Sequence, residues 1–510
     1  MKVTLNHFHL FCGSGGGALG FNQADARVGS LEADFQCIGG IDVDPNAIAD
    51  FTRLTGVDGT VMDLFSKEQY TRFHGKAPPP GWREATAQDI QRAAQNHSPN
   101  IVFTSAPCKG FSGLLAKSKA DSDKYQALNE LTVRGFFLTL EAFKDDPPEF
   151  IIMENVPRIE SRGGPLLDWI EALLNYFGYA VARTTHDCGE IGGLAQSRRR
   201  FLMVARHVEK VPPFLYEPTK RPLQSVGRVL EQFPLPGCPS AGPMHSLAKL
   251  QFKTWLRLAF VEPGSDWRSL ERLQVKDGVL SDYLLMPKNY GFSTVLGVNC
   301  WDQHVGAISG RSSASTGAYS VADPRLNDSK FLPHFKIVAR DEQAQGVELQ
   351  TIADVRSKLA KVNGGAYQSA RHYGVLNWDD FSGAVTSSCR HDNGAWSVAD
   401  PRLPSPELRT RTIIESVSGH WHRPFTTLEL AALQGLVSPD DTPLTLAGNS
   451  HAQWRERIGN MVPPKSATGI AEVMGKTLLL NFSEQTQLIA QTPVWVRPIA
   501  VGLSLASKSY

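Results

Sequence analysis

A single cysteine stands where an apolar segment ends in a loop of small residues. Residues 100–106 (NIVFTSA) read as a strand, and Pro107 and Cys108 follow it directly, with Lys109 next. In an open α/β sheet, ligands bind just outside the carboxyl ends of the strands. A neighbouring positive charge also favours the reactive thiolate form of a cysteine. Cys108 is therefore a candidate nucleophile, and a small residue in a structural loop is the alternative.

Charged side chains stand at the ends of two later segments. Residues 149–156 (EFIIMENV) form an apolar strand that ends with Glu154 and Asn155. A carboxyl group at such an edge is partly shielded from water, which favours its action as an acid. Further along, Arg198 and Arg200 fall on one side of a period-two alternation, and paired guanidinium groups bind phosphate or a carbonyl oxygen. The alternatives are a helix cap for Glu154 and a solvated basic surface for the arginines.

The N-terminal segment predicts a site for a nucleoside-like cofactor. A short apolar strand at 7–11 runs into the turn CGSGGG, a pattern in which backbone closely approaches a nucleotide. Asp42 and Asp44 end the next strand and Asp63 ends a third, where a carboxylate can hold ribose hydroxyl groups. The glycines are not followed by a Lys-Ser or Lys-Thr pair, which argues against a P-loop. A dinucleotide stays open on these residues, and a flexible turn is the alternative.

Alternating strands and helices are expected to position these residues. Over 1–210, apolar strands alternate with amphipathic helices, of which 128–143 and 165–178 are the clearest. This alternation is typical of a parallel sheet with crossover helices, so the expected fold class is α/β and Rossmann-like, with a mostly parallel sheet. The helical pattern returns in 421–485, and residues 486–510 read as a tail or an added strand.

The middle of the chain, residues 211–420, differs in character. It is rich in Gly, Ser, Asn, Asp and Trp and poor in periodicity, so an irregular, loop-rich second domain is expected. Within it, residues 296–326 align without gaps to residues 373–403, and both copies keep Ser-Val-Ala-Asp-Pro-Arg-Leu. We interpret this as a local duplication in which the second copy joins the two domains and the first serves recognition or packing. The alternative is that both copies have only a structural role.

The bulk composition limits the class of protein. The 510 residues are 42% hydrophobic and 20% charged, which is ordinary for a soluble globular chain. We expect no membrane span and no signal peptide, and hence an intracellular protein. Seven scattered cysteines without a Cys-x-x-Cys pair argue against a disulfide framework and a zinc ribbon, so no metal is expected. With a net charge of +1, a nucleic-acid surface would depend on local clusters.

Taken in order, the motifs resemble those of the DNA (cytosine-5) methyltransferases. The resemblance covers roughly residues 1–210 and 420–480. The motifs that carry it are Phe11-x-Gly-x-Gly-Gly, Asp42, Asp63, Pro107-Cys-x-Gly-Phe-Ser, Glu154-Asn-Val, Gln196-x-Arg-x-Arg, Thr-x-x-Glu-x-Ala-x-Leu-Gln-Gly at 426–435 and Gly-Asn-x-Val-Pro-Pro at 459–464.

This resemblance implies a covalent mechanism and a cofactor, S-adenosyl-L-methionine. Cys108 would attack carbon 6 of a cytosine flipped out of the duplex, Glu154 would assist at N3, and Arg198 and Arg200 would orient the base. Carbon 5 would then take the methyl group, while the segment of about 110–124 closes over the base. The implied cofactor-binding residues are Phe11, Gly13, Ser14, Gly15, Gly16, Asp42, Val43, Asp63, Leu64, Pro107, Leu128, Asn460 and Met461.

The resemblance also implies the roles of the domains and the partners. Residues 1–210 and 421–485 would form a discontinuous catalytic domain, and 211–420 a target recognition domain for double-stranded DNA. Phe11 would stack on adenine, Asp42 would hold the ribose and Asp63 the adenine amine. A monomer is expected in the cytoplasm of a bacterial or phage-infected cell, at the nucleoid, with a cognate restriction endonuclease as a candidate partner.

Some positions depart from the family pattern, and other functions stay open. His9 stands where an acidic residue is common, Lys109 where glutamine is common, and Asp42 where glutamate is more usual. The alternatives within this chemistry are a tRNA cytosine-5 methyltransferase and a transferase that uses a modified S-adenosylmethionine donor. Outside it, they are a Rossmann-type oxidoreductase with a catalytic thiol and a non-enzymatic DNA-binding relative.

Overall fold

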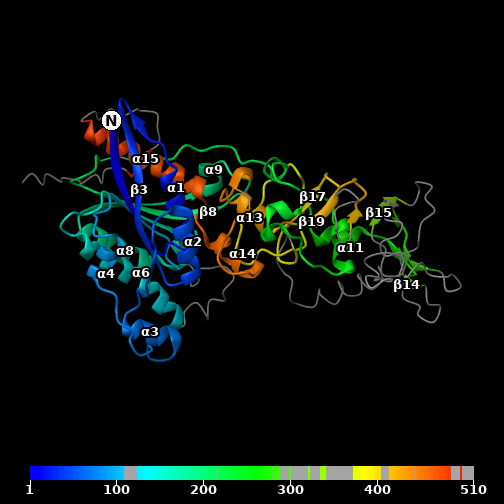
Figure 1. Cartoon of the computed structure of the whole chain (residues 1–510), viewed down its shortest axis with the longest axis horizontal. Coiled ribbons are helices and arrows are strands. Elements are labelled where there is room, and N and C mark those ends of the chain that lie inside the picture. The colour runs from blue at the N-terminus through cyan, green and yellow to red at the C-terminus, as the bar shows by residue number, and fades with distance from the viewer. Residues whose placement is uncertain are drawn as a thin grey trace, which may run out of the picture.

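The computed structural model consists of a large sheet domain and a smaller domain that lie beside each other along the long axis of the molecule (Figure 1). The structure describes residues 1–107, 123–213, 215–277, 279–287, 298–299, 320–321, 334–339, 372–403, 413–441, 443–483 and 494–496.

The central sheet of the large domain is mostly parallel. Its strands lie in the order β2-β3-β1-β5-β6-β8-β7, and β4 pairs with β3 at one side. β3, β1, β5 and β6 run parallel, whereas β8 is antiparallel to both β6 and β7. The bounds are β1 (Lys2–Leu10), β2 (Arg27–Val28), β3 (Leu31–Asp42), β4 (Thr60–Val61), β5 (Ile101–Thr104), β6 (Phe150–Asn155), β7 (Tyr179–Asp187) and β8 (Arg199–His207). The predicted α/β fold with a mostly parallel sheet is confirmed.

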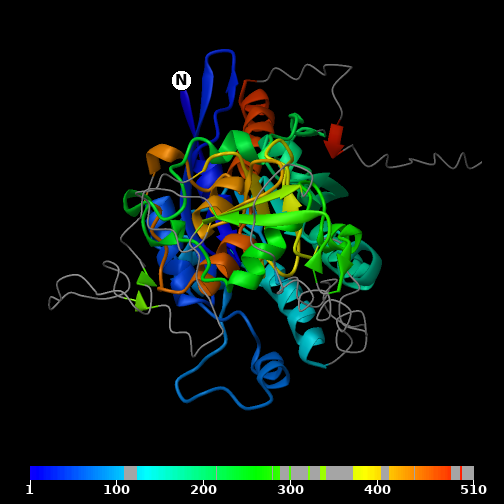
Figure 2. The same cartoon turned by 90° about the vertical axis from the view of Figure 1, so that its right-hand side faces the viewer.

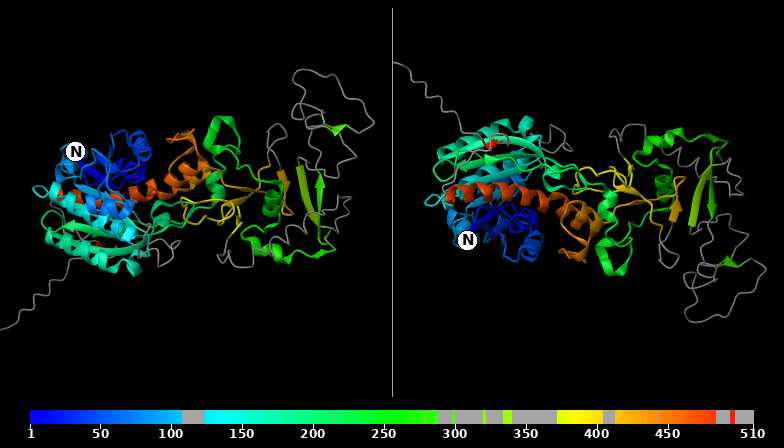
Figure 3. Two further views of the ribbon diagram at one scale, coloured as in Figure 1. Left: turned by 90° about the horizontal axis from the view of Figure 1, so that it is seen from below. Right: turned by 90° about the horizontal axis from the view of Figure 1, so that it is seen from above.

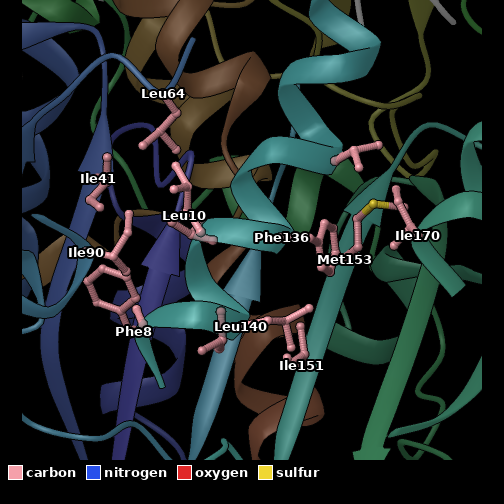
Figure 4. Close-up of a cluster of buried hydrophobic side chains, with 14 of the residues drawn as sticks. Phe8, Leu10, Ile41, Leu64, Ile90, Phe136, Leu140, Ile151, Met153 and Ile170 are labelled. Atoms are coloured by element: carbon pink, nitrogen blue, oxygen red, sulfur yellow. The ribbon is translucent and has the colours of Figure 1, made fainter. Parts of the chain in front are cut away.

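Helices cover both faces of this sheet, because its strands are apolar on both sides. In β6, Ile151 and Met153 face one cluster of buried side chains and Phe150 and Ile152 face the other. The first cluster, shown in Figure 4, packs under α4 (Ala87–Ala93), α6 (Asp123–Ala142) and α8 (Gly164–Tyr176). The second packs against α1 (Gly16–Asn22) and α15 (Pro464–Phe482). The helices expected at 128–143 and 165–178 are α6 and α8.

Helix α15 brings a late part of the chain back to the first strand. It packs beside α1, near the N-terminal segments, in both views of Figure 3. A side chain at Gly20 would begin 2.1 Å from the carbonyl oxygen of Pro464, so the two helices approach too closely for any residue but glycine. The other helices among the described residues of this domain are α2 (Pro45–Thr55), α3 (Lys67–His74), α7 (Ile159–Arg162), α9 (Cys188–Gly192), α13 (Thr427–Leu433) and α14 (His451–Asn460).

The smaller domain is built on a six-stranded sheet, which Figure 2 shows in front of the large domain. The strand order is β12-β15-β18-β19-β17-β16. Its strands are β12 (Tyr283–Pro287), β15 (His334–Ala339), β16 (Val375–Leu376), β17 (Ser397–Asp400), β18 (Ile413–Glu415) and β19 (Trp421–Pro424). Its helices include α10 (Val226–Leu230) and α11 (Phe252–Phe260), and the 3-10 turns are η1 (Pro239–Ala241), η2 (Pro243–His245), η3 (Trp267–Arg272) and η4 (Pro439–Asp441).

The internal repeat is visible in the strand pairing. β13 (Val298–Asn299) pairs in parallel with β14 (Ser320–Val321), and Val298 lies opposite Ser320. In the second copy, β16 pairs in parallel with β17, and Val375 lies opposite Ser397. Each residue of the first pair lies 77 positions before its counterpart in the second. The duplication therefore preserves both the direction and the register of a strand pair.

Short two-stranded pairs complete the fold. β20 (Val494–Val496) pairs antiparallel with β9 (Leu215–Tyr216), so part of the segment expected as a tail or added strand is a strand. β10 (Val275–Lys276) pairs with β11 (Val279–Leu280). Within the described ranges, no helix has both the length and the apolar character that a membrane crossing needs. The same ranges hold no cluster of three or more His, Cys, Asp or Glu that could bind a metal.

Candidate active site

The expected site residues gather where the chain changes direction across the sheet. From β1 the chain passes to β3 on one side, and later to β5 on the other side of β1. Such a point, where the strand order reverses, leaves a crevice at the carboxyl ends of the strands. Phe11, Asp42 and Ser105 each lie at or directly after such an end. The backbone N–H of Ser105 donates to the carbonyl of Leu10 at 3.2 Å, which fixes the end of β5 beside that of β1.

The glycine turn takes a backbone shape that few other residues allow. Phe11, Gly13 and Gly15 all have positive φ, at 51°, 51° and 86°, which is costly for a side chain such as Phe11. A β-carbon at Gly13 would meet no atom of the described residues within 4 Å, so among them space is open in front of this turn. A β-carbon at Gly16 would lie 2.2 Å from Cγ of Met461. The turn is therefore closed on one side by Met461 and open on the other.

Asp42 ties the glycine turn to the end of β3. One of its carboxylate oxygens accepts from the backbone N–H of Gly13 at 2.9 Å and the other from that of Asp44 at 3.0 Å. Burial raises the pKa of Asp42, and these backbone hydrogen bonds oppose that rise. Val43 beside it is 64% exposed, whereas the Ser14 side chain is buried, with its hydroxyl 3.5 Å from Asp50. Because its side chain is buried, Ser14 is a candidate to contact a cofactor through its backbone.

Asp63 and the residues around Phe11 form the adjoining wall. Asp63 accepts from the backbone N–H of Phe65 at 2.9 Å and from the indole Nε1–H of Trp82 at 3.2 Å. Leu64 and Leu128 are buried in the cluster against which the Phe11 ring packs. A carboxylate oxygen has two lone pairs, so Asp63 keeps acceptor capacity for a further donor.

Glu154 is held by two partners at the carboxyl end of β6. Its Oε1 lies 2.8 Å from Nε of Arg200 and its Oε2 accepts from the hydroxyl of Ser105 at 3.0 Å. Glu154 is 6% exposed, so this is a buried, charge-assisted pair. Asn155 donates to the carbonyl of Ala106 at 3.3 Å, which fixes the chain leading to Pro107. Cys108, Lys109 and the rest of the segment expected to close over the base lie outside the described residues.

Arg198 has different partners from Arg200. It is buried, and its terminal nitrogens donate to the carbonyls of Val385 at 2.7 Å, Gly459 at 3.0 Å and Met461 at 3.2 Å. β8 begins at Arg199, so Arg198 precedes the strand and the alternation rule does not govern it. Arg200 thus joins Glu154, while Arg198 joins the smaller domain to the segment that contains Asn460 and Met461.

Gln196 completes this junction. Its side chain accepts from the backbone N–H of Val385 at 3.0 Å and donates to Oε1 of Gln434 at 2.6 Å. Gln434 in turn donates to the carbonyl of Ile458 at 2.6 Å. The glutamine and the first arginine of Gln-x-Arg-x-Arg therefore hold segments of the chain together, and the second arginine contacts Glu154.

Several residues of this site were not predicted from the sequence. Ser105 and Trp82 contact Glu154 and Asp63, but a lone serine or tryptophan carries no signal of its own. Outside the site, Thr426 and Glu429 of the predicted Thr-x-x-Glu motif form a capping box at the start of α13, and this motif before an apolar run is the local pattern for it. Glu429 also pairs with Arg423, which only the fold brings to it.

The fold and this site together define a class. A sheet with a reversal of strand order, a glycine turn, acidic strand ends and a buried carboxylate–guanidinium pair is the architecture of an α/β enzyme that binds a nucleoside cofactor. Residues 5–237 match the family of C-5 cytosine-specific DNA methylases. This match confirms, over residues 5–237, the family resemblance that the motifs predicted. No curated protein sequence matches the chain.

Solved structures that match the chain include methyltransferases from three organisms. The Entamoeba histolytica methyltransferase EhMeth is 12% identical and has a TM-score of 0.49, with 95% of this chain and 100% of that chain covered. A putative DNA modification methyltransferase encoded within an E. coli prophage is 14% identical, with a TM-score of 0.42 and coverage of 93% and 99%. The S. pombe Dnmt2 methyltransferase is 14% identical, with a TM-score of 0.42 and coverage of 94% and 99%.

The match of residues 5–237 to this family implies S-adenosyl-L-methionine as the cofactor, and the residues present fit it. The turn at Gly13 opens onto free space, and Asp42 and Asp63 offer carboxylate oxygens to the hydroxyl and amine groups of an adenosine. Phe11 lies at the same edge, with its ring 3.1 Å from where a β-carbon at Gly135 would begin. When bound, the cofactor supplies an electrophilic methyl group.

Proposed function

We propose that this protein transfers a methyl group from S-adenosyl-L-methionine to carbon 5 of a cytosine in a specific sequence of duplex DNA. The observation that carries the proposal is that the buried Glu154 contacts both Arg200 and Ser105. Ser105 lies two positions before Pro107 in the sequence, and Cys108 follows Pro107. This setting offers a proton-transferring carboxyl group, and Cys108, close to Ser105 in the sequence, is the candidate for the nucleophile that addition to a pyrimidine ring also requires.

The chemistry that we assign to the chain begins with Cys108. Its thiolate forms a bond to carbon 6, and N3 takes a proton from Glu154, so that charge does not accumulate on the ring. Arg200 holds the O2 carbonyl. Carbon 5, now an enamine carbon, takes the methyl group from the donor, which would leave as S-adenosylhomocysteine. A base removes the carbon-5 proton, N3 returns its proton to Glu154, and the Cys108 sulfur leaves with the bonding electrons as the double bond between carbons 5 and 6 reforms. Because carbon 6 is stacked in a duplex, the base must be flipped out first.

The other assignments follow from position. We assign Phe11, Asp42 and Asp63 to the adenosine, and the glycine turn with Pro107, Asn460 and Met461 to the rest of the cofactor wall. Leu64 and Leu128 support that wall from the core. We assign residues 211–420 to sequence recognition, since the described residues of this range include β12 and β15–β18 of the smaller domain. Arg198 is a positioning residue in this scheme, because its side chain donates to backbone carbonyls.

Covalent trapping tests the proposal. A duplex that carries 5-fluorocytosine cannot lose a proton from carbon 5, so the enzyme should remain bound to it in the presence of cofactor. The wild-type protein and Cys238→Ser, which changes a cysteine in the smaller domain, should form a denaturation-resistant complex, and Cys108→Ser should not. A complex that forms only with tRNA carrying the same base would show that tRNA, and not DNA, is the substrate. A complex formed by Cys108→Ser would show that Cys108 is not the nucleophile.

A further inference from the structure

A segment that projects from the sheet domain reaches back to the cofactor-facing edge. It runs from Ser66 to Thr86 and contains α3, which stands out below the sheet in Figure 1. Trp82 on this segment donates its indole Nε1–H to Oδ2 of Asp63 at 3.2 Å. The Trp82 ring also packs against the core of the domain, but its N–H ends on a carboxylate at the edge where ligands are expected to bind.

Asp63 lies directly beside the end of β3. β4 pairs in parallel with β3, with Val61 opposite Asp42, and the backbone N–H of Met62 donates to the carbonyl of Asp42 at 2.9 Å. Asp63 follows one residue later. The two carboxylates therefore stand at adjacent strand ends, as the two acceptors of one adenosine would.

Trp82 is itself fixed by contacts on both sides. Its ring lies 5.2 Å from that of Tyr70 on α3, and its backbone N–H donates to Pro79 at 3.1 Å. α3 in turn is held to α6 by the ion pair of Arg72 with Glu130 at 2.8 Å. The segment that carries the indole N–H is thus held in place by contacts with the rest of the domain.

These contacts restrict the carboxylate to one orientation. Phe65 holds Oδ1 through its backbone N–H and Trp82 holds Oδ2 through the indole. Each oxygen has a second lone pair, and a fixed carboxylate presents those lone pairs in fixed directions. A site built to accept a hydrogen bond selects strongly against a ligand that offers an acceptor in its place.

We infer that Trp82 is a positioning residue which fixes Asp63, so that the site selects the 6-amino group of adenine over a 6-oxo group. The inference rests on the proposed function for the presence of an adenosine cofactor. It adds to that function a determinant of purine recognition in the 66–86 segment.

The test compares two ligands that differ at carbon 6 of the purine. Affinities of the full chain for S-adenosylhomocysteine and S-inosylhomocysteine are measured by calorimetry. Wild-type protein should prefer the adenosyl ligand. Trp82→Phe keeps an aromatic ring but loses the N–H, and should weaken adenosyl binding about tenfold while inosyl binding changes little. Asp63→Asn, which can donate to a 6-oxo group, should abolish or reverse the preference.

The controls separate this role from packing. Trp169→Phe replaces a tryptophan of α8 that is 59% exposed, and should leave both affinities at the wild-type values. If the ratio of the two affinities in Trp82→Phe is the same as in the wild type, the inference is overturned, since a role in packing alone does not distinguish the purines. If wild-type protein binds both ligands equally, the inference fails and the proposed methyl transfer stands; if it binds neither, both fail.

Discussion

At the scale of single residues, the two partners of Glu154 differ in what they can do. The guanidinium of Arg200 only donates hydrogen bonds. The hydroxyl of Ser105 donates or accepts, so it can stay bonded to Glu154 in both protonation states. A group that must give up and regain a proton in each cycle benefits from such a neighbour.

We therefore expect Ser105→Ala to slow methyl transfer. Hydrogen bonds to charged groups contribute about 1.5–3 kcal/mol, which corresponds to a loss of roughly ten- to a hundredfold in rate if the bond is fully used in the transition state. Single-turnover rates on duplex DNA measure this effect. Ser105→Thr keeps the hydroxyl and should retain most of the activity. An alanine variant as fast as the wild type would show that Ser105 has no part in the chemistry.

Two buried histidines make a separate prediction about acid stability. Nδ1 of His7 lies 2.8 Å from Nε2 of His9 inside the domain. Burial lowers the pKa of His7 to about 3. Burial also lowers the pKa of His9, and the neighbouring His7 lowers it further. The unfolded chain takes up these protons near pH 6.5 and the folded chain does not. Stability should therefore be complete above about pH 6.5 and fall below it, by about 2 kcal/mol at pH 5 for His7 alone.

Urea unfolding at pH 5 and pH 7.5 measures this effect. The pH dependence should be shallower in His7→Gln, which cannot titrate, than in the wild type. His97→Gln, at an exposed position, should keep the wild-type slope. An unchanged slope in His7→Gln would contradict the account.

At the scale of elements, a buried ion network joins strands to a helix. Arg423 on β19 pairs with Asp400 on β17 at 2.7 Å and with Glu429 on α13 at 2.8 Å. All three side chains are almost completely buried. Although burial favours the protonated acid, Arg423 and Arg402 lower the pKa of Asp400. Arg402 also donates to the carbonyls of α10 and its C-terminal turn, so the repeated Asp-Pro-Arg of the second copy ties several elements together.

Removal of the central arginine should destabilise the protein. Arg423→Leu leaves two buried carboxylates without this partner, which costs about 3–5 kcal/mol in comparable sites. Arg390→Leu in the same domain removes an arginine whose side chain is 60% exposed, and should change stability by less than about 1 kcal/mol. Chemical unfolding of both variants provides the comparison, and equal losses would contradict the assignment.

The sequence allowed the prediction of elements whose residues are contiguous. The helices at 128–143 and 165–178 and the apolar strands of the main sheet follow from local periodicity. The smaller sheet does not, because its strands are short and pair across long stretches of chain: β15 lies beside β18, and β19 lies between β18 and β17. Likewise, Ser105 and Trp82 gain their roles from residues distant in sequence, whereas Glu154 and Arg200 could be named from their strand ends.

At the scale of the whole molecule, Arg198 and Gln196 connect the two domains to the cofactor wall. Arg198 reaches Val385 in the smaller domain and Gly459 and Met461 in the segment against the glycine turn. The planar guanidinium donates in several directions at once, and a lysine ammonium does not reproduce that geometry. Docking of the smaller domain and closure of the cofactor wall should therefore depend on the same side chain.

Arg198→Lys should accordingly weaken cofactor binding without removing any residue assigned to contact the cofactor. We expect about a tenfold loss of affinity for S-adenosylhomocysteine, measured by calorimetry. Arg199→Lys, one position along and exposed, is the matched control and should bind as the wild type does. Wild-type affinity in Arg198→Lys would mean that this junction does not support the site.

The central claim is methyl transfer to carbon 5 of cytosine in duplex DNA, and analysis of the product nucleosides tests it most directly. Duplex DNA of mixed sequence is incubated with the protein and S-adenosyl-L-methionine, digested, and resolved by mass spectrometry. We predict 5-methyldeoxycytidine with the wild type and none with Cys108→Ser. A methyl group on another base or another position of cytosine, or 5-methylcytidine formed only in tRNA, would contradict the account.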